Sequence, residues 1–171
     1  MTSSILEFCK FLWLLPITIL VWLFYVLPLW AVGEIEYEGK ADTFIWIFLN
    51  PIDPDSVYDK AWAKWAGQAL PCAYIYAKHT TFNGPLYDQI TKIHEVKHCK
   101  DQLLFGPFFY LGYAGHSTWL GVSNLWKKEE DKRHIYHENF LEVRARKAAG
   151  QRAVIPRDEW MDGPKDYNPW L

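Results

Sequence analysis

Residues 11–32 form a stretch of 22 residues without a charged side chain, bounded by Lys10 and Glu34. At 1.5 Å per residue, a helix of this length is about 33 Å long, enough to cross the hydrocarbon core of a bilayer. So long an apolar stretch must be buried in protein or in lipid, which limits how the rest of the chain can fold. We therefore predict an N-terminal membrane anchor, residues 1–33, that meets the lipid bilayer through residues 11–32.

Two alternatives exist for this segment. Ala31-Val32-Gly33 resembles the cleavage site of a secretory signal, but the apolar stretch is long for a signal and few basic residues precede it. The second alternative is that the segment is a buried helix of a soluble domain. We predict a retained, single-pass anchor. Because Lys10 and Lys40 flank it almost evenly, the distribution of basic residues gives only a slight preference for a domain on the non-cytoplasmic side.

Composition supports a membrane setting and narrows the partners. Aromatic residues make up 18% of the 171 residues, with ten each of Trp, Tyr and Phe, as is typical of proteins at a membrane interface. The net charge is −2 and no Lys/Arg-rich block occurs, so no nucleic-acid partner is predicted. Three cysteines without regular spacing do not predict a disulfide framework.

The run His94-Glu95-Val96-Lys97-His98 is the strongest functional motif. Two histidines four residues apart lie on one face of a helix, so both imidazoles can reach a single zinc ion at about 2.0–2.1 Å. The glutamate between them can take a proton from a water molecule on that ion. An accidental match is expected in about one such sequence in a hundred. We predict a zinc site with His94 and His98 as ligands and Glu95 as the catalytic base.

The residues around this motif predict a helix. Asn83-Gly84-Pro85 is a start signal, and no Gly or Pro follows from Leu86 to Leu104. One side of the predicted helix is apolar and the histidines fall on another. The alternative is an ordinary amphipathic helix with two surface histidines. Since several lysines surround the motif, the helix belongs in water or at the interface.

A catalytic zinc site usually takes a third protein ligand. The candidates after the motif are His116, His134, His137, Glu138 and Glu142. Residues 127–150 are predicted to form a second helix ending at Gly150, with Glu138 and Glu142 on one face. Glu142 has a simpler interpretation, a surface pair with Arg146 one helical turn away. The residues alone leave the third ligand open.

These motifs together resemble a known family. The H-E-x-x-H run with Gln102, then Phe105-Gly106-Pro107, and then Asn139-x-x-Glu142-x-x-Ala145 resemble small zincin-like metallopeptidases of bacterial and phage genomes, over roughly residues 72–150. In the glutamate-ligand type a second helix supplies the third ligand, so the resemblance implies Glu142. Residues 101–105 lack the extended motif that would place a third histidine on the same segment.

The predicted fold class is α+β and mainly helical, and the resemblance implies a minimal zincin-like domain. Residues 43–49 and 72–78 are predicted strands, and residues 57–70 a helix. Residues 103–126 are predicted to be a buried or interfacial hairpin; a second membrane span is the alternative. The predicted domains are the anchor at 1–33, a metal-binding domain at 34–150 and an extended tail at 151–171.

The sequence therefore predicts a membrane-anchored zinc metallopeptidase that hydrolyses peptide bonds with a metal-activated water and acts on a peptide or protein substrate. The alternative is a non-catalytic membrane or virion structural protein that retains a zincin-like fold. A chain this short leaves little room for a substrate-binding subdomain, which supports the alternative. The presence of Glu95 opposes it, because a purely structural site needs no general base.

Overall fold

The computed structural model describes residues 2–50, 67–77, 85–153 and 155. The chain forms two compact units, residues 1–107 (the first unit) and residues 108–171 (the second unit). The elements are mostly helices with one small mixed sheet, as the predicted α+β class required. The narrower expectation of a zincin-like fold stays a prediction.

The apolar stretch lies within one long helix. It runs through α1 (Thr2–Val21), a widened π turn (Trp22–Val26) and α2 (Leu27–Ala31), which together we call the N-terminal helix. Its segment Ile5–Ala31 is long and apolar enough to cross a bilayer. The expectation of a helix of membrane length is thus confirmed, while the crossing itself stays a prediction.

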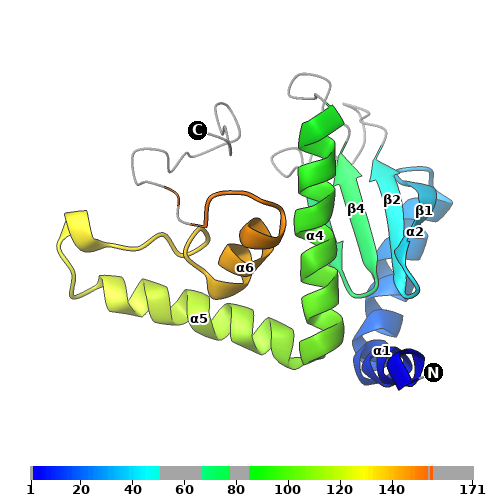
Figure 1. The fold of residues 1–171 in the computed structure, drawn as a ribbon, viewed down its shortest axis with the longest axis horizontal. Coiled ribbons are helices and arrows are strands. Elements are labelled where there is room, and N and C mark those ends of the chain that lie inside the picture. The colour runs from blue at the N-terminus through cyan, green and yellow to red at the C-terminus, as the bar shows by residue number, and fades with distance from the viewer. Residues whose placement is uncertain (1, 51–66, 78–84, 154, 156–171) are drawn as a thin grey trace. The chain divides into compact units, whose positions relative to one another are not determined.

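The first unit contains a four-stranded sheet in the order β1-β2-β4-β3 (Figure 1). The strands are β1 (Glu36–Asp42), β2 (Ile45–Asn50), β3 (Gly67–Leu70) and β4 (Ala73–Ala77). The central pair, β2 and β4, is parallel, and the two outer pairings are antiparallel. The strands predicted at 43–49 and 72–78 are confirmed as β2 and β4.

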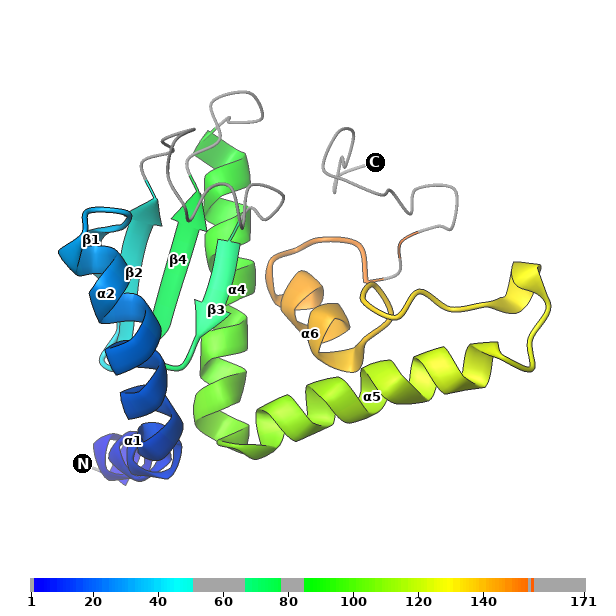
Figure 2. The ribbon, with the colours of Figure 1, turned by 180° about the vertical axis from the view of Figure 1, so that it is seen from behind.

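Helices cover both faces of this sheet. The helix α4 (Pro85–Phe105) packs on one face and the N-terminal helix on the other (Figures 1 and 2). Side chains alternate between the faces along each strand. Accordingly Ile47 and Tyr74 join the cluster with Cys99 of α4, while Phe48 and Ile75 join the cluster with Val26 of the N-terminal helix. The predicted start and end of the metal-site helix agree with α4.

The second unit begins with α5 (Phe108–Asn124), a single helix. The hairpin predicted within residues 103–126 is therefore wrong. A turn at Gly106-Pro107 separates α4 from α5, with Gly106 at φ +57°. Gly112, Gly115 and Gly121 do not interrupt α5, because an isolated glycine weakens a helix without ending it.

The second predicted helix is much shorter than expected. Only α6 (Phe140–Ala148) is α-helical, preceded by a short 3-10 turn at Glu129–Asp131. The side chain of Asn124 donates to the carbonyl of Arg133 at 2.6 Å and accepts from its amide at 2.8 Å. These bonds hold the backbone at Arg133 in a non-helical path, and Asn139 then starts α6.

Two further predictions need comment. The helix predicted at 57–70 falls largely outside the described residues, but its last residues, 67–70, form the strand β3 instead. Pro71, which directly follows the predicted helix, lies in the turn between β3 and β4. The extended tail predicted at 151–171 lies almost entirely outside the described residues.

Candidate metal centre

His94 and His98 converge from two successive turns of α4. Their Nε2 atoms are 3.1 Å apart and both side chains are buried. The rings are steeply inclined, with centroids 4.8 Å apart. The four-residue spacing produces this arrangement, since residues i and i+4 lie one above the other on a helix. The predicted pairing of the two imidazoles is confirmed within the first unit.

The histidine geometry fits a zinc ion. Two nitrogens bound to one tetrahedral zinc ion at about 2.0–2.1 Å stand about 3.3 Å apart, close to the observed 3.1 Å. The same distance also suits a hydrogen bond between the rings. Zinc binding and a hydrogen bond between the rings both require the two Nε2 atoms to face each other. The side chains therefore need little rearrangement to accept an ion.

Glu95 lies on the side of α4 that faces β3. A Cβ atom at Gly67 of β3 would lie 2.9 Å from Cγ of Glu95 and 2.9 Å from the ring of Tyr74. Glycine at this position thus leaves the space that the Glu95 side chain occupies. Within the described residues β3 is also an edge of the sheet, because β4 is paired on both sides and β3 only with β4.

Polar contacts hold α4 against the sheet. The Sγ atom of Cys99 donates to the carbonyl of Ala73 at 3.4 Å, and Nε2 of Gln102 donates to the carbonyl of Ala69 at 3.2 Å. Burial raises the pKa of the Cys99 thiol well above its usual value, so the side chain stays neutral. Cys99 belongs to the buried cluster between α4 and the sheet, so it serves packing. Gln102 thereby fastens α4 to β3.

Exposed ion pairs join α4 to β1. Lys92 lies 3.7 Å from Glu38 and Lys100 lies 3.2 Å from Asp42. Such solvent-exposed pairs contribute at most about 1 kcal/mol each. They show that this side of the first unit is polar and charged, as expected for a metal helix in water or at an interface.

In the second unit, Glu142 sits in the first turn of α6 and is buried. Tyr113 of α5 donates its hydroxyl proton to Oε1 of Glu142 at 2.9 Å. Asn139 caps α6 by accepting from the amide of Leu141, and its own amide donates to the carbonyl of Tyr113 and to Ser117. One asparagine thus starts the helix that carries Glu142 and ties it to α5 beside Tyr113.

The other candidate ligands are engaged locally. His116 accepts from the amide of Phe140, and His134 accepts from the amides of Tyr136 and His137. Glu138 pairs with Arg133 at 3.4 Å. Burial, with the nearby charges of His134 and Arg146, lowers the pKa of His137 to about 4. The two candidate carboxylates therefore differ, because Glu138 is paired with Arg133 and Glu142 is buried.

The structure also shows the contacts of other polar residues near the candidate ligands. Arg146, expected beside Glu142, donates to the carbonyls of His137 and Ala153. Asp101 forms an ion pair with Lys97. Tyr113 is bonded to Glu142, and the ring of Tyr110 packs edge-on against Phe109.

The first unit brings together His94, His98 and Glu95, and Glu142 belongs to the second unit. Their joint binding of one ion stays a prediction. Sequence reasoning missed two residues that shape these groups. Gly67 gave no signal, because its role depends on the pairing of β3. Asn139 appeared only as part of a motif, although an asparagine ahead of a helix is a recognisable N-cap signal.

Comparison with protein-family models, with curated proteins and with solved structures found no match.

Proposed function

We propose that this protein is a membrane-anchored zinc metallopeptidase, in which His94, His98 and Glu142 bind one zinc ion and Glu95 acts as the base. The observation that carries the proposal is the approach of the two buried Nε2 atoms to 3.1 Å on a helix that also bears Glu95. This combination of two ligands and a base matches the requirements of hydrolysis by a metal-activated water.

Glu142 is the best third ligand in chemical terms. The three side chains offer two imidazole nitrogens and one carboxylate oxygen, a ligand set that zinc accepts in catalytic sites. Tyr113 bonded to one carboxylate oxygen would fix the orientation of the ligand, as residues behind a metal ligand commonly do. The proposal requires the first unit to present α4, and the second unit to present α6, to the same ion.

The chain's own residues account for the proton transfers. Zinc, when bound, supplies a Lewis acid that polarises the scissile carbonyl and lowers the pKa of water. Glu95 takes a proton from the attacking water and passes it to the leaving amine. The lysines on α4, including Lys97 and Lys100, keep this helix in an aqueous or interfacial setting, which argues against cleavage inside the bilayer.

The edge of β3 supports an extended peptide as substrate. An exposed strand edge can pair with a peptide through backbone hydrogen bonds. Gly67 on this strand is packed against Glu95, so a peptide paired with β3 would pass close to the base. The neighbouring strand β4 is paired on both sides and so offers no edge to a peptide.

Metal content tests the ligand set. We expect about one zinc ion per chain in the purified protein, lost in His94→Ala and in Glu142→Ala. Glu138→Ala is the matched control, because Glu138 is a carboxylate of the same unit that pairs with Arg133 instead. Zinc retained in Glu142→Ala would move the third ligand to another residue. No zinc in the wild type after zinc is supplied would refute the proposal.

The substitution Glu95→Gln tests catalysis separately from binding. It keeps the side chain's shape but removes its basicity, so zinc should remain and peptide hydrolysis should fall by on the order of a hundredfold or more. A wild-type protein that binds zinc but hydrolyses no peptide from a diverse library would favour the alternative function, a non-catalytic membrane or virion structural protein.

A further inference from the structure

The N-terminal helix has two distinct faces. Leu14 and Val26 are fully buried in the core of the first unit, and Trp22 and Tyr25 pack against it. The opposite side, which we call the outer face, is apolar and exposed. Its main residues are Leu12, Ile19, Leu20, Leu23 and Phe24, each at least 47% exposed. Within the part of the chain that the structure describes, protein thus covers one side of the helix only.

The inner side is bonded to β3 and to the turn between β3 and β4. Nε1 of Trp22 donates to the carbonyl of Pro71 at 3.0 Å, and the hydroxyl of Tyr25 donates to Oε1 of Gln68 at 3.0 Å. Thr18 lies 3.7 Å from the sulfur of Cys72. These residues fall in the middle of the uncharged stretch 11–32, where a crossing helix would pass the centre of the bilayer.

A crossing would therefore carry the sheet into the hydrocarbon. The sheet lies alongside the second half of the N-terminal helix (Figure 2), and its strand β1 exposes Glu36, Glu38, Lys40 and Asp42. Charged side chains and unpaired strand edges are strongly unfavourable at that depth. The helix can cross the bilayer only if the first unit loses this packing.

We infer that the N-terminal helix lies along the surface of a lipid bilayer, with its outer face among the acyl chains and the sheet on its aqueous side. Interfacial helices bind membranes through an exposed apolar face that is buried about 5–10 Å into the boundary between headgroups and acyl chains. Here the other face is covered by the first unit instead of being polar. The inference rests on the membrane association proposed above and does not depend on zinc or catalysis.

The distribution of charge and aromatic residues points to lipid as the occupant of the outer face. No charge interrupts residues 11–32, while the charged side chains of the first unit gather on β1 and α4. Trp13 and Trp30 pack partly on protein, Trp13 against the end of α4 and Trp30 against Phe48, and keep 49% and 50% of their surface exposed. Half-covered indoles of this kind suit the headgroup level beside the outer face.

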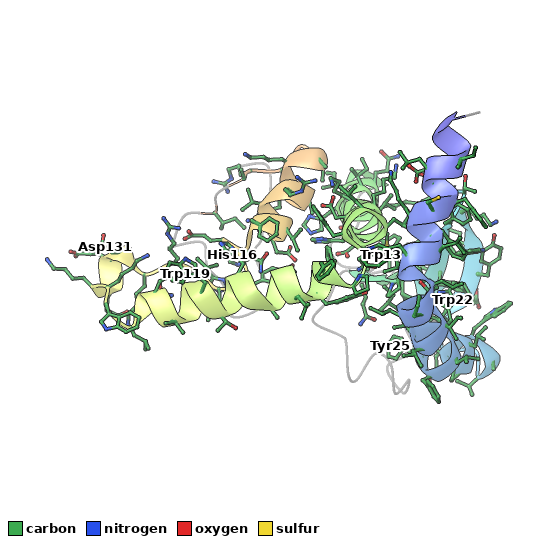
Figure 3. The ribbon with its side chains drawn as sticks, turned by 90° about the horizontal axis from the view of Figure 1, so that it is seen from below. Trp13, Trp22, Tyr25, His116, Trp119 and Asp131 are labelled. Carbon is green, nitrogen blue, oxygen red and sulfur yellow. The ribbon has the colours of Figure 1, made fainter. Side chains whose placement is uncertain are left out.

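Trp13 also fixes the metal helix to the membrane helix. It lies against the end of α4 (Figure 3), where its Nε1 donates to the carbonyl of Phe105 at 3.3 Å. Because α4 and the N-terminal helix cover opposite faces of the sheet, α4 is held on the aqueous side. A substrate would then be a peptide segment outside the hydrocarbon, near the membrane surface.

Spin-label depth measurements on the full chain in phosphatidylcholine vesicles test the orientation. Cysteine is placed singly at Leu12, Leu20 and Val32 in a Cys9→Ser background, and the accessibility of each label to oxygen and to a water-soluble nickel complex gives its depth. These sites are exposed, so the substitutions should leave the fold intact. A label at Glu36, which is exposed on β1, is the aqueous control.

We expect the three labels to lie at shallow depths within about 5 Å of one another. A crossing helix would instead place Leu20 about 12 Å deeper than Leu12, which would overturn the inference but leave the membrane anchor standing. Labels that are as accessible to nickel as the label at Glu36 would overturn both the surface orientation and the membrane anchor. Labels shielded from both reagents would assign the outer face to a second protein chain and equally overturn the inference.

Discussion

Gly67 shows how a residue without a functional group can control a catalytic one. A Cβ at this position would lie 2.9 Å from Glu95 Cγ and from the buried ring of Tyr74. Because the ring is fixed in the core, the backbone of β3 would have to shift away from it and the Glu95 side chain would have to move as well. We expect Gly67→Ala to lower peptide hydrolysis by on the order of ten- to a hundredfold while zinc content is unchanged.

The matched control is Gly115→Ala on α5, where an added Cβ meets nothing within 4 Å. This variant should keep full activity and gain slightly in stability, because alanine favours helices over glycine. Equal activity in Gly67→Ala and the wild type would show that Glu95 does not need its present position.

Tyr113 should act on metal affinity. Tyr113→Phe removes the hydroxyl that donates to Oε1 of Glu142, and with it the group that orients the carboxylate. We expect zinc affinity, measured by competition with a chelator, to fall by about ten- to a hundredfold. Tyr110→Phe on the same helix is the control and should have no effect. An unchanged affinity in Tyr113→Phe would argue against Glu142 as ligand.

At the scale of single residues, spacing predicted what lies on one helix and little else. The pairing of His94 with His98 follows from the helical period, and it is confirmed. The neighbours of Glu95 and Glu142 come from other elements, namely Gly67 on β3 and Tyr113 on α5. Contacts of this kind depend on tertiary packing, which no local pattern encodes.

Among the elements, the junction of α4 with the N-terminal helix depends on Gly106. This residue is at φ +57°, and a Cβ there would overlap the indole of Trp13. We expect Gly106→Ala to destabilise the first unit by two contributions, about 1–2 kcal/mol from backbone strain and about 1–3 kcal/mol from overpacking. Chemical unfolding in detergent would measure the sum.

Gly33→Ala separates the two contributions. Gly33 has a similar φ of +79° but nothing within 4 Å of its added Cβ, so it should show the backbone cost alone. Equal destabilisation in both variants would mean that Trp13 moves aside freely and does not clamp α4.

Strands and helices could be predicted where their buried side chains leave a pattern of apolar residues in the sequence. β2 and β4 are central and rich in buried apolar residues, so both were predicted. β1 is exposed along most of its length, and β3 has only four residues, so neither carries a strand pattern. The second predicted helix was too long, because side-chain bonds from Asn124 determine the backbone at Arg133.

For the molecule as a whole, the two faces of the N-terminal helix should separate folding from lipid binding. Leu14 is fully buried and Leu20 is 57% exposed, on the same helix. Leu14→Ala should cost about 2–5 kcal/mol of the free energy of unfolding in detergent. Leu20→Ala should change it by at most about 0.5 kcal/mol. Similar costs for both would mean that the helix is surrounded evenly and has no inner face.

Hydropathy alone did not distinguish these faces. The apolar stretch scores as a membrane span because both faces are apolar, and only the packing of Leu14 and Val26 shows that protein occupies one of them. The polar groups that mark the inner face, Thr18 and Tyr25, are too few to register in an average over the helix.

The order of synthesis gives the contact between Leu14 and Leu103 a further consequence. Leu14 shares a buried cluster with Leu103 of α4, which leaves the ribosome 103 − 14 = 89 residues later. At about 5–20 residues per second, Leu14 waits roughly 4–18 s before this partner exists. During that interval the N-terminal helix is apolar and lacks part of its protein covering. Delivery to a membrane while the chain is still growing would protect it through that interval.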